Sequence, residues 1–383
     1  MATPLRLLTV IGARPQVIKA AALSRAIREQ FDGRIKETIL HTGQHYDANM
    51  SGVFFGELGI PEPEVQLGVG SGTQGATTAR MVEGIEAVLL RKAHDVLVIY
   101  GDTNSTLAGA LAAAKLHVPI AHIEAGLRSF NKAMPEEVNR IVADHCSTWL
   151  FCPTTTAVMN LDREGFSLNT DHPATMDKPH VVNSGDVMLD NALHFSGIKK
   201  NSSILDGIGP TGTEFMLVTV HRQNNTDDVQ RLNAIFGALM ELRQRTKMPV
   251  LLPVHPRTQQ RMNDLLDPSL ARAVEQDQGL RLIPPVGYLD MLELERNARV
   301  VITDSGGVQK EASFFAKPCV ILRSETEWVE LVEQGHGELV DADPERLFGA
   351  VDRALAAKAC STPKVFGDGN AALHICEHLI RTR

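Results

Sequence analysis

Acidic side chains follow two apolar runs in the first half of the chain. Asp102 comes soon after DVLVIY (95–100), and Glu124 is the last residue of PIAHIE (119–124). Glu136 lies further on, in MPEEVNR. Carboxyl groups at strand ends can take up and release protons when their surroundings shift the pKa. Any one of these acids could instead cap a helix or pair with a cation, but three on turns at one sheet edge favour proton-transfer chemistry.

Two cations lie at the start of a predicted helix, in GARPQVIK (12–19). Arg14 and Lys19 fall in its first turns, and Pro15 suits the first helical position. The helix dipole disfavours cations at this end, so the arrangement is unfavourable unless an anion compensates it. We therefore predict contact with a diphosphate; the alternative is an Arg14 whose stem packs on the protein while its charged end reaches water, and a solvated Lys19.

A Gly-rich turn in the second half, TDSGGVQKE (303–311), could bind an anion. Ser305, Gly306 and Gly307 follow an apolar run and open a predicted helix. Glycines let a phosphate approach the backbone, and the free N–H groups of a helix start attract anions. Glu311 lies about one and a half turns into that helix and could accept hydrogen bonds from a ribose diol. The alternative is an ordinary helix cap followed by a surface Glu.

His221 follows another apolar run, MLVTV (216–220), and precedes the polar turn RQNNTD. A histidine in this position could donate to a phosphate or carry a proton. A lone histidine is often structural, however, and His255 in PVHPR has the same ambiguity with weaker support.

All these residues belong to a repeated pattern of short apolar runs, polar turns and helix-like stretches. The first half carries LLTVI, ETILHT, DVLVIY and PIAHIE, and the second carries MLVTV, VLLPV and VVIT. Unbroken apolar strands that alternate with helices predict parallel sheets covered on both faces. The sequence therefore predicts an α/β protein with two Rossmann-like, doubly wound domains facing a cleft. Ligands of such folds bind beyond the carboxyl ends of the strands.

The pattern breaks in a Gly/Ser/Pro-rich stretch, GIKKNSSILDGIGPTGTE, where we expect a domain boundary. We predict an N-terminal domain over residues 1–195 that carries the acids. A C-terminal domain over 196–366 would carry the Gly-rich turn. Residues 367–383 predict a helix that packs back on the N-terminal domain.

Composition narrows the class of partner. The 383 residues carry a formal net charge of −8 and only 5% aromatic residues, which argues against a nucleic-acid polymer as partner. No apolar run reaches the roughly 18–20 residues of a membrane helix, and the quickly polar start does not resemble a signal peptide. The five cysteines form no CxxC pair, so we expect reduced thiols in a cytoplasmic protein.

The stretch GVGSGTQG (68–75) has a superficial likeness to a dinucleotide-binding loop. Its spacing is not GxGxxG after an opening strand, and the first strand is followed by GARP instead. The sequence also lacks GxxxxGK[ST], HExxH and GxSxG. We therefore expect neither a nicotinamide cofactor nor a metal ion.

Taken together and in order, these motifs resemble those of the non-hydrolysing UDP-N-acetylglucosamine 2-epimerases. The set is GARPQVIK, GQHYD, YGDTNSTLAGALAA, HIEAGLRS, MPEEVNR, HRQNNTD, TDSGGVQKEA and a late GDG, and it runs from residue 7 to about 380. The resemblance implies a fold like that of the GT-B glycosyltransferases, with a UDP-sugar bound between the domains. It also implies no cofactor, and it commonly implies a homodimer.

The resemblance assigns roles to individual residues. Catalytic roles fall to three acids and a histidine, namely Asp102, Glu124, Glu136 and His221. UDP-sugar binding falls to Arg14 and Lys19 on the phosphate side, to Ser305, Gly306 and Gly307 at the diphosphate, and to Glu311 at the ribose. PPVGYLDM (284–291), which contains Tyr288, lies where the family contacts uracil. A Gln–His segment used in the family's allosteric response matches Gln44 and His45.

Three departures from the family's motifs indicate a subfamily. UDP-N-acetylglucosamine enzymes usually read GTRPE, GDTTT and TTERPE where this chain reads GARPQ, GDTNS and SETEWVE. The chain is more similar to enzymes acting on UDP-2,3-diacetamido-2,3-dideoxy-glucuronate, which supply the mannuronate epimer for lipopolysaccharide O-antigen. Trp328 stands where the family carries a ligand-binding Arg. A C6 carboxylate and a C3 acetamido group need a different sugar pocket, so we expect Trp328 to contact the substrate and affect substrate choice.

The resemblance implies an elimination–addition route. UDP leaves C1, the C2 proton is removed to give a 2-acetamidoglycal, and both return with C2 inverted. Cationic groups would support the departing UDP, and acids would move the protons. UDP-N-acetylglucosamine is the alternative substrate. The alternative functions are a GT-B glycosyltransferase and a UDP-sugar sensor without catalysis.

Overall fold

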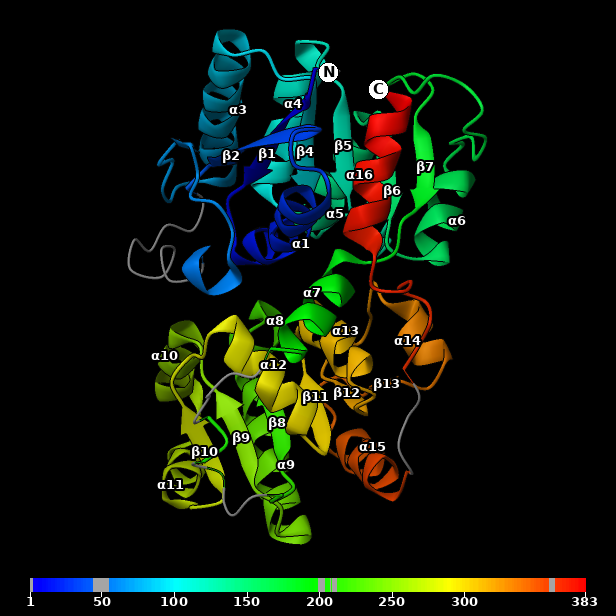
Figure 1. The fold of residues 1–383 in the computed structure, drawn as a ribbon. Helices are drawn as coiled ribbons and strands as arrows, with labels where there is room; N and C mark the ends of the chain where they lie inside the picture. The colour runs from blue at the N-terminus through cyan, green and yellow to red at the C-terminus, as the bar shows by residue number, and fades with distance from the viewer. Residues whose placement is uncertain (1–2, 44–54, 199–203, 207, 209–211, 358–361) are drawn as a thin grey trace. The chain divides into compact units, whose positions relative to one another are not determined.

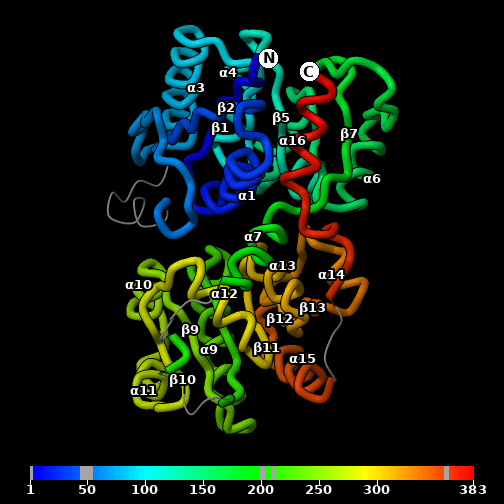
Figure 2. Tube along the Cα trace, in the orientation of Figure 1, coloured from blue at the N-terminus to red at the C-terminus, as the bar shows by residue number. Residues whose placement is uncertain are grey.

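The computed structural model describes residues 3–43, 55–198, 204–206, 208, 212–357 and 362–383. The contacts divide the chain into two compact units, Met1–His194 with Lys364–Arg383, and Phe195–Pro363. Figure 1 labels the helices and strands of each unit, and Figure 2 traces the same chain as a tube. The predicted Gln44–His45 segment lies outside the described residues.

Within the described residues, the first unit has a seven-stranded parallel sheet in the order β3-β2-β1-β4-β5-β6-β7. Its strands are β1 (Leu5–Ile11), β2 (Ile35–His41), β3 (Val65–Gln66), β4 (Val96–Tyr100), β5 (Ile120–Ile123), β6 (Trp149–Cys152) and β7 (His180–Asn183). β1 and β4, consecutive in space but separated in sequence by β2 and β3, form the point where the strand order reverses.

Helices cover both faces of this sheet. α1 (Arg14–Gln30) packs against the C-terminal helix α16 (Ala371–Thr382), while α4 (Asn104–Lys115) packs against α3 (Gln74–Arg91) and α5 (Pro135–His145). Figure 1 also labels α6 (Thr155–Arg163) and α7 (Val187–Ser196), which follow β6 and β7. Threonine side chains cap α3, α4 and α6 by accepting a first-turn N–H, which is a favoured N-cap arrangement.

The C-terminal helix α16 belongs to the first unit although the second unit precedes it in the chain. Asp190 of α7 accepts the N–H groups of Ala371 (3.0 Å) and Ala372 (2.8 Å) at the start of α16. A carboxylate here satisfies otherwise unpaired donors and complements the helix dipole. The apolar side of α16, including Ile375 and Leu379, is buried.

The second unit repeats the plan. Its described residues form a six-stranded parallel sheet in the order β10-β9-β8-β11-β12-β13. The strands are β8 (Met216–Thr219), β9 (Val250–Pro253), β10 (Leu280–Ile283), β11 (Val300–Thr303), β12 (Cys319–Ile321) and β13 (Gly337–Leu339). The helices are α8 (Gln223–Thr226), α9 (Val229–Thr246), α10 (Pro256–Leu265), α11 (Pro268–Gln276), α12 (Tyr288–Asn297), α13 (Gly306–Phe314), α14 (Val329–Glu333) and α15 (Pro344–Ala356).

The central strands of the two sheets, such as β4 (VLVIY) and β8 (MLVT), are almost wholly apolar because both faces of each sheet are buried. Met216 and Val218 of β8 face a core that includes α9 and α15, whereas Leu217 faces the core under α12 and α13. Alternate residues of a strand point to opposite faces, so a sheet covered twice needs apolar residues at every position. The predicted α/β class, with two doubly wound parallel sheets, is confirmed.

The two points of strand reversal, β1/β4 and β8/β11, are where such folds bind ligands beyond the carboxyl ends of the strands. GARPQ, GDTNS and DSGG directly follow β1, β4 and β11, and HRQNN begins one residue after β8. No helix in the described part of the chain is long and apolar enough to span a lipid bilayer.

Candidate active site

Lys19 and Glu124 form an ion pair at the carboxyl edge of the first sheet. Lys19 lies in α1 and Glu124 follows β5, and their side chains are only 12% and 11% exposed. Gly101, after β4, has φ +61°, and a Cβ there would lie 3.0 Å from Nζ of Lys19. Glycine therefore permits both the left-handed backbone and the close approach of the ammonium group. The Glu124 carboxylate also compensates the cation near the start of α1.

Glu124 itself has a left-handed backbone, with φ 70°. Its N–H donates to the carbonyl oxygen of Phe151 at 3.0 Å. Two residues earlier, the His122 ring contacts Asp144 and the Gly101 carbonyl oxygen, each at 2.7 Å. A left-handed backbone costs a non-glycine residue about 1–2 kcal/mol and persists only where its surroundings enforce it. This network therefore holds Glu124 in the conformation that pairs it with Lys19.

Asp102 follows Gly101 and pairs with Arg140 of α5. Asn139, next to Arg140, donates to the Asp102 carbonyl oxygen at 2.9 Å. The Asp102 side chain remains 32% exposed. Burial lowers the pKa of Arg140, but the charges of Asp102 and Glu137 outweigh it and raise that pKa overall. Asp102 is thus an anchored carboxylate that still reaches solvent.

The two glutamates of MPEEVNR have different environments. Glu137 is 1% exposed and accepts the N–H groups of Ser129 (3.0 Å) and Phe130 (2.9 Å). Burial raises the pKa of Glu137, but these hydrogen bonds and the charge of Arg140 have the larger effect. The pKa of Glu137 therefore lies below its ordinary value. Glu136 is exposed on the first turn of α5, and its carboxylate makes no hydrogen bond or ion pair with the residues that the structure describes. The structure therefore brings Asp102 and Glu124 to the strand ends and leaves the Glu136 carboxylate at the surface.

Gln16 joins two of the loops, a role that the sequence reasoning missed. Its Oε1 accepts the Gly12 N–H at 2.9 Å, and its Nε2 donates to the Tyr100 carbonyl oxygen and the Thr106 hydroxyl, both at 3.0 Å. Arg14, two residues earlier, is the half-buried first residue of α1. The sequence did contain a signal for this role: GARPQ has a glutamine where the family usually has the glutamate of GTRPE. An amide side chain can both accept and donate hydrogen bonds, whereas a carboxylate can only accept them.

His221 and Asp304 form a pair at the point of strand reversal in the second unit. Nδ1 of His221 lies 2.9 Å from the Asp304 carboxylate, which is fully buried, whereas the His221 side chain is 46% exposed. Asp304 also accepts the N–H of Arg222 and the amide of Asn225. Burial raises the pKa of Asp304, but His221 and these donors lower it overall. A carboxylate on Nδ1 leaves Nε2 as the outward-facing nitrogen, and Asp304 is a positioning residue that sequence reasoning did not assign.

The predicted diphosphate turn opens α13. Ser305 is its N-cap residue and accepts the Val308 N–H. A Cβ at Gly306 would overlap Oε1 of Glu327, whereas the nearest atom to a Cβ at Gly307 is 3.8 Å away. Glycine at 306 thus makes room for Glu327, and glycine at 307 leaves the first turn of α13 open.

The two aromatic residues predicted to bind substrate are enclosed in the second unit. Trp328 is 2% exposed, and Nζ of Lys310 lies 4.2 Å from the centre of its indole ring, a cation–π contact. Tyr288, the first residue of α12, is 3% exposed and meets the Phe195 ring edge-on at 6.1 Å. Their ligand roles stay predictions.

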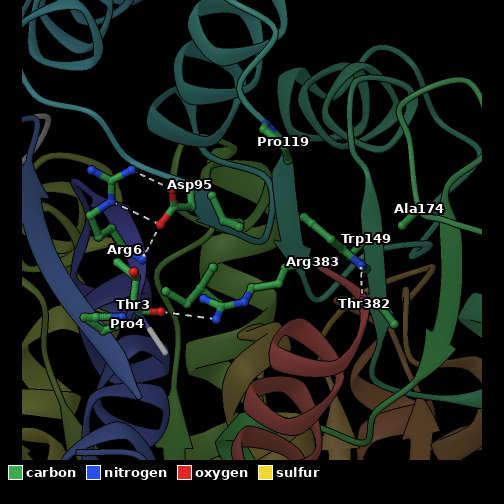
Figure 3. Close-up of a pocket in the computed structure, with 11 residues that line it drawn as sticks. Thr3, Pro4, Arg6, Asp95, Pro119, Trp149, Ala174, Thr382 and Arg383 are labelled. Carbon is green, nitrogen blue, oxygen red and sulfur yellow. Dashed lines mark hydrogen bonds and ion pairs between the residues drawn. The ribbon is translucent and has the colours of Figure 1, made fainter. Parts of the chain in front are cut away.

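A cavity of about 550 Å³ lies at the opposite edge of the first sheet. Figure 3 shows its lining, which includes Arg6, Asp95, Pro119 and Trp149 from the amino ends of β1, β4, β5 and β6. Arg6 is already paired with Asp95 at 2.7 Å. This cavity contains none of the predicted site residues, so the candidate site remains at the carboxyl edges.

The two units present complementary chemistry. The first offers carboxylates beside cations, which can move protons. The second offers a His–Asp pair and an open helix start, which can bind an anionic leaving group and donate to it.

A family model described as UDP-N-acetylglucosamine 2-epimerase matches residues 27–380. The chain belongs to this family. It is therefore a non-hydrolysing UDP-sugar 2-epimerase, an isomerase, as the motif resemblance predicted.

Individual relatives in the family match over their whole length. UDP-2,3-diacetamido-2,3-dideoxy-D-glucuronate 2-epimerase of Pseudomonas aeruginosa is 48% identical over 381 residues, 98% of this chain and 100% of that protein. A UDP-N-acetylglucosamine 2-epimerase homolog of Methanococcus maripaludis is 44% identical, covering 98% and 99%. The crystal structure of Methanocaldococcus jannaschii UDP-GlcNAc 2-epimerase, in complex with UDP-GlcNAc and UDP, is 38% identical with a TM-score of 0.86, covering 98% and 100%. The GT-B-like fold class is confirmed.

Proposed function

We propose that this enzyme inverts C2 of UDP-2,3-diacetamido-2,3-dideoxy-D-glucuronate to give the mannuronate epimer. The observation that carries the substrate choice is the 48% identity to the Pseudomonas enzyme of that name over the full chain. The buried Trp328, which replaces the Arg of the TTERPE motif and stacks with Lys310, supports it, because the change alters the wall beside the diphosphate turn.

The proposed reaction is elimination followed by addition. The C1–O bond breaks, and UDP leaves with the bonding electrons. A carboxylate takes the C2 proton, and the C2–H electrons form the C1–C2 double bond of a 2-acetamidoglycal. A carboxyl group then returns a proton to the opposite face of C2, and a diphosphate oxygen attacks C1. Atoms and electrons balance without an external oxidant or cofactor.

Each requirement of this proposed route has candidate residues at the carboxyl edges of the two sheets. Asp102 and Glu124 are candidates for the two proton transfers because both lie at the strand ends with a cation beside them. Glu136 is the third candidate, although its carboxylate is exposed here. Lys19, Arg14 and the outward Nε2 of His221 would stabilise the charge that develops on UDP.

The proposal requires that water be excluded from the bound substrate, because water would trap the cation-like intermediate. We further propose a cytoplasmic homodimer that supplies lipopolysaccharide O-antigen synthesis, which rests on the subfamily resemblance.

Incubation of the purified chain with each UDP-sugar in D2O tests the proposal. We expect deuterium at C2 of both epimers by NMR, and faster turnover of the diacetamido uronate than of UDP-N-acetylglucosamine. Equal or faster turnover of UDP-N-acetylglucosamine would overturn the substrate. Sugar transfer or free UDP as the only product would overturn the mechanism.

A further inference from the structure

Two buried carboxyl groups meet between α12 and α13 of the second unit. The Glu295 carboxyl lies within hydrogen-bonding reach of the Glu311 carboxyl. Glu295 is fully buried, whereas Glu311 is 5% exposed. Neither oxygen of Glu295 receives an N–H or O–H donor from the described residues. Its neighbour in reach is therefore another acid.

Two carboxylates cannot both be ionised in a buried site without a cation between them, because their repulsion and desolvation add. One must hold a proton and donate a hydrogen bond to the other. Burial, followed by the charge and hydrogen bond of Glu311, raises the pKa of Glu295 well above its usual value. Glu295 is also the deeper group, so it is the neutral donor and Glu311 the charged acceptor.

Glu311 lies on the helix that begins with the diphosphate turn. It is five residues after Gly306, which places it about 7.5 Å along the helix axis from the first turn. This offset is of the size of a ribose joined to a diphosphate. A charged carboxylate there suits the 2′- and 3′-hydroxyls, because hydrogen bonds to an ionised acceptor are strong.

We propose that Glu295 is a positioning residue for nucleotide recognition: as a neutral acid it donates to one oxygen of Glu311 and fixes the carboxylate to receive the ribose diol. This inference deepens the proposed function and rests on it, since it takes the nucleotide to bind at α13. Glu295 contacts no substrate in this scheme and acts only through Glu311.

The test compares UDP with 2′,3′-dideoxy-UDP, which lacks the diol, by isothermal titration calorimetry on the full chain. The variants are Glu295→Met, which fills the space without a donor, and Glu295→Gln, whose amide can still donate. Glu293→Met, on the same helix with its carboxylate bonded to Asn297, is the matched control. Thermal unfolding of each variant checks the fold.

We expect wild type to bind UDP about tenfold or more tightly than the dideoxy analogue. Glu295→Met should lose most of that preference while binding the analogue as wild type does, and it should unfold at or above the wild-type temperature. Glu295→Gln and Glu293→Met should keep the preference.

If wild type prefers UDP over the analogue, two results would overturn the role of Glu295 without affecting the proposed function. One is a Glu295→Met variant that keeps the full preference. The other is equal weakening of UDP and its analogue, which would show general loss of packing. Failure of wild type to bind UDP would instead overturn the proposed function, and the inference with it.

Discussion

At the scale of single residues, the site consists of carboxylates held by cations and backbone donors. Asp102 is anchored by Arg140, and Glu124 is held in a left-handed conformation beside Lys19. Such an arrangement would hold the proposed proton acceptors in position before substrate arrives, which would lower the reorganisation that the proposed reaction needs. It also means that these acids are separable by mutation, because each has its own cation.

We expect Asp102→Asn, Glu124→Gln and Glu136→Gln each to reduce turnover by about 100-fold or more, because an amide cannot carry the proton. UDP affinity should change little. Turnover from initial rates and UDP affinity from calorimetry check this. Glu64→Gln, which removes a carboxylate from an exposed ion pair with Lys92, is the control. Near-wild-type turnover of all three variants would refute the acid assignment.

Trp328 contacts Lys310, so we expect that replacing Trp328 by the family's arginine, without also changing Lys310, destabilises the protein. Trp328→Arg would bring a second cation against Nζ of Lys310 in a buried site. We expect a loss of about 2–4 kcal/mol in the free energy of unfolding, measured by urea denaturation. Trp328→Phe, which keeps an aromatic ring, should lose less. An arginine variant as stable as wild type would contradict the coupling.

Sequence reasoning selected the candidate site residues by type but could not identify the residues that they contact. It found Asp102, Glu124 and His221 because each follows an apolar strand. It could not tell that Glu137, rather than Glu136, is the buried acid of MPEEVNR, since helical phase depends on how α5 packs. Asp304 and Gln16 were not assigned their roles because their partners, His221 and the carbonyl oxygen of Tyr100, are distant in the chain.

At the scale of elements, the strand pattern was the most predictable feature. The apolar run VVIT (300–303) has the same bounds as β11. The run LLTVI (7–11) falls within β1, which begins two residues earlier. The pattern did not single out β6 (Trp149–Cys152) or β7 (His180–Asn183), where long polar connections interrupt the alternation. An apolar run of four residues carries little signal unless its neighbours in the sheet are known.

The first turn of α13 gives a prediction about an element rather than a side chain. Gly307→Ala has room for its Cβ and should keep or raise stability by up to about 1 kcal/mol, because alanine favours helix. The same methyl group should block close approach of a phosphate and weaken UDP binding by about tenfold or more.

The matched control for Gly307→Ala is Gly237→Ala in α9, where a Cβ would meet no atom within 4 Å. It should gain similar stability with unchanged UDP affinity. Thermal unfolding and UDP titration of both variants decide the matter. Unchanged UDP affinity in Gly307→Ala would remove α13 from the diphosphate site.

At the scale of the whole molecule, we expect the stability of the first unit, which α16 completes, to depend on pH. Burial, together with the charges of His180 and Arg381, lowers the pKa of His378 to about 4. Unfolding restores a value near 6.5, so the unfolded chain binds the proton more strongly. Stability contributed by the neutral His378 is therefore present above pH 6.5 and is lost as the pH falls towards 4.

The non-titrating variant His378→Gln isolates this effect. Burial raises the pKa of Asp190 to about 6, so Asp190 stabilises the folded state as the pH falls over nearly the same range. Wild type and the variant share Asp190, so its effect cancels in the comparison. We expect the free energy of unfolding, from urea titrations at pH 7.5, 6 and 5, to fall more in wild type than in the variant. The difference should reach about 3 kcal/mol at most. Parallel pH profiles would rule out His378 as the source.

The placement of α16 also bears on how the chain is made. The first unit needs Ile375, Cys376 and Leu379 to complete its buried surface, yet these residues leave the ribosome only after the whole of the second unit. Domains generally fold as units while synthesis proceeds. Here the residues of the second unit, Phe195–Pro363, emerge before the first unit has its final helix. A nascent chain must therefore carry an unfinished first unit, with exposed apolar surface, until α16 has emerged.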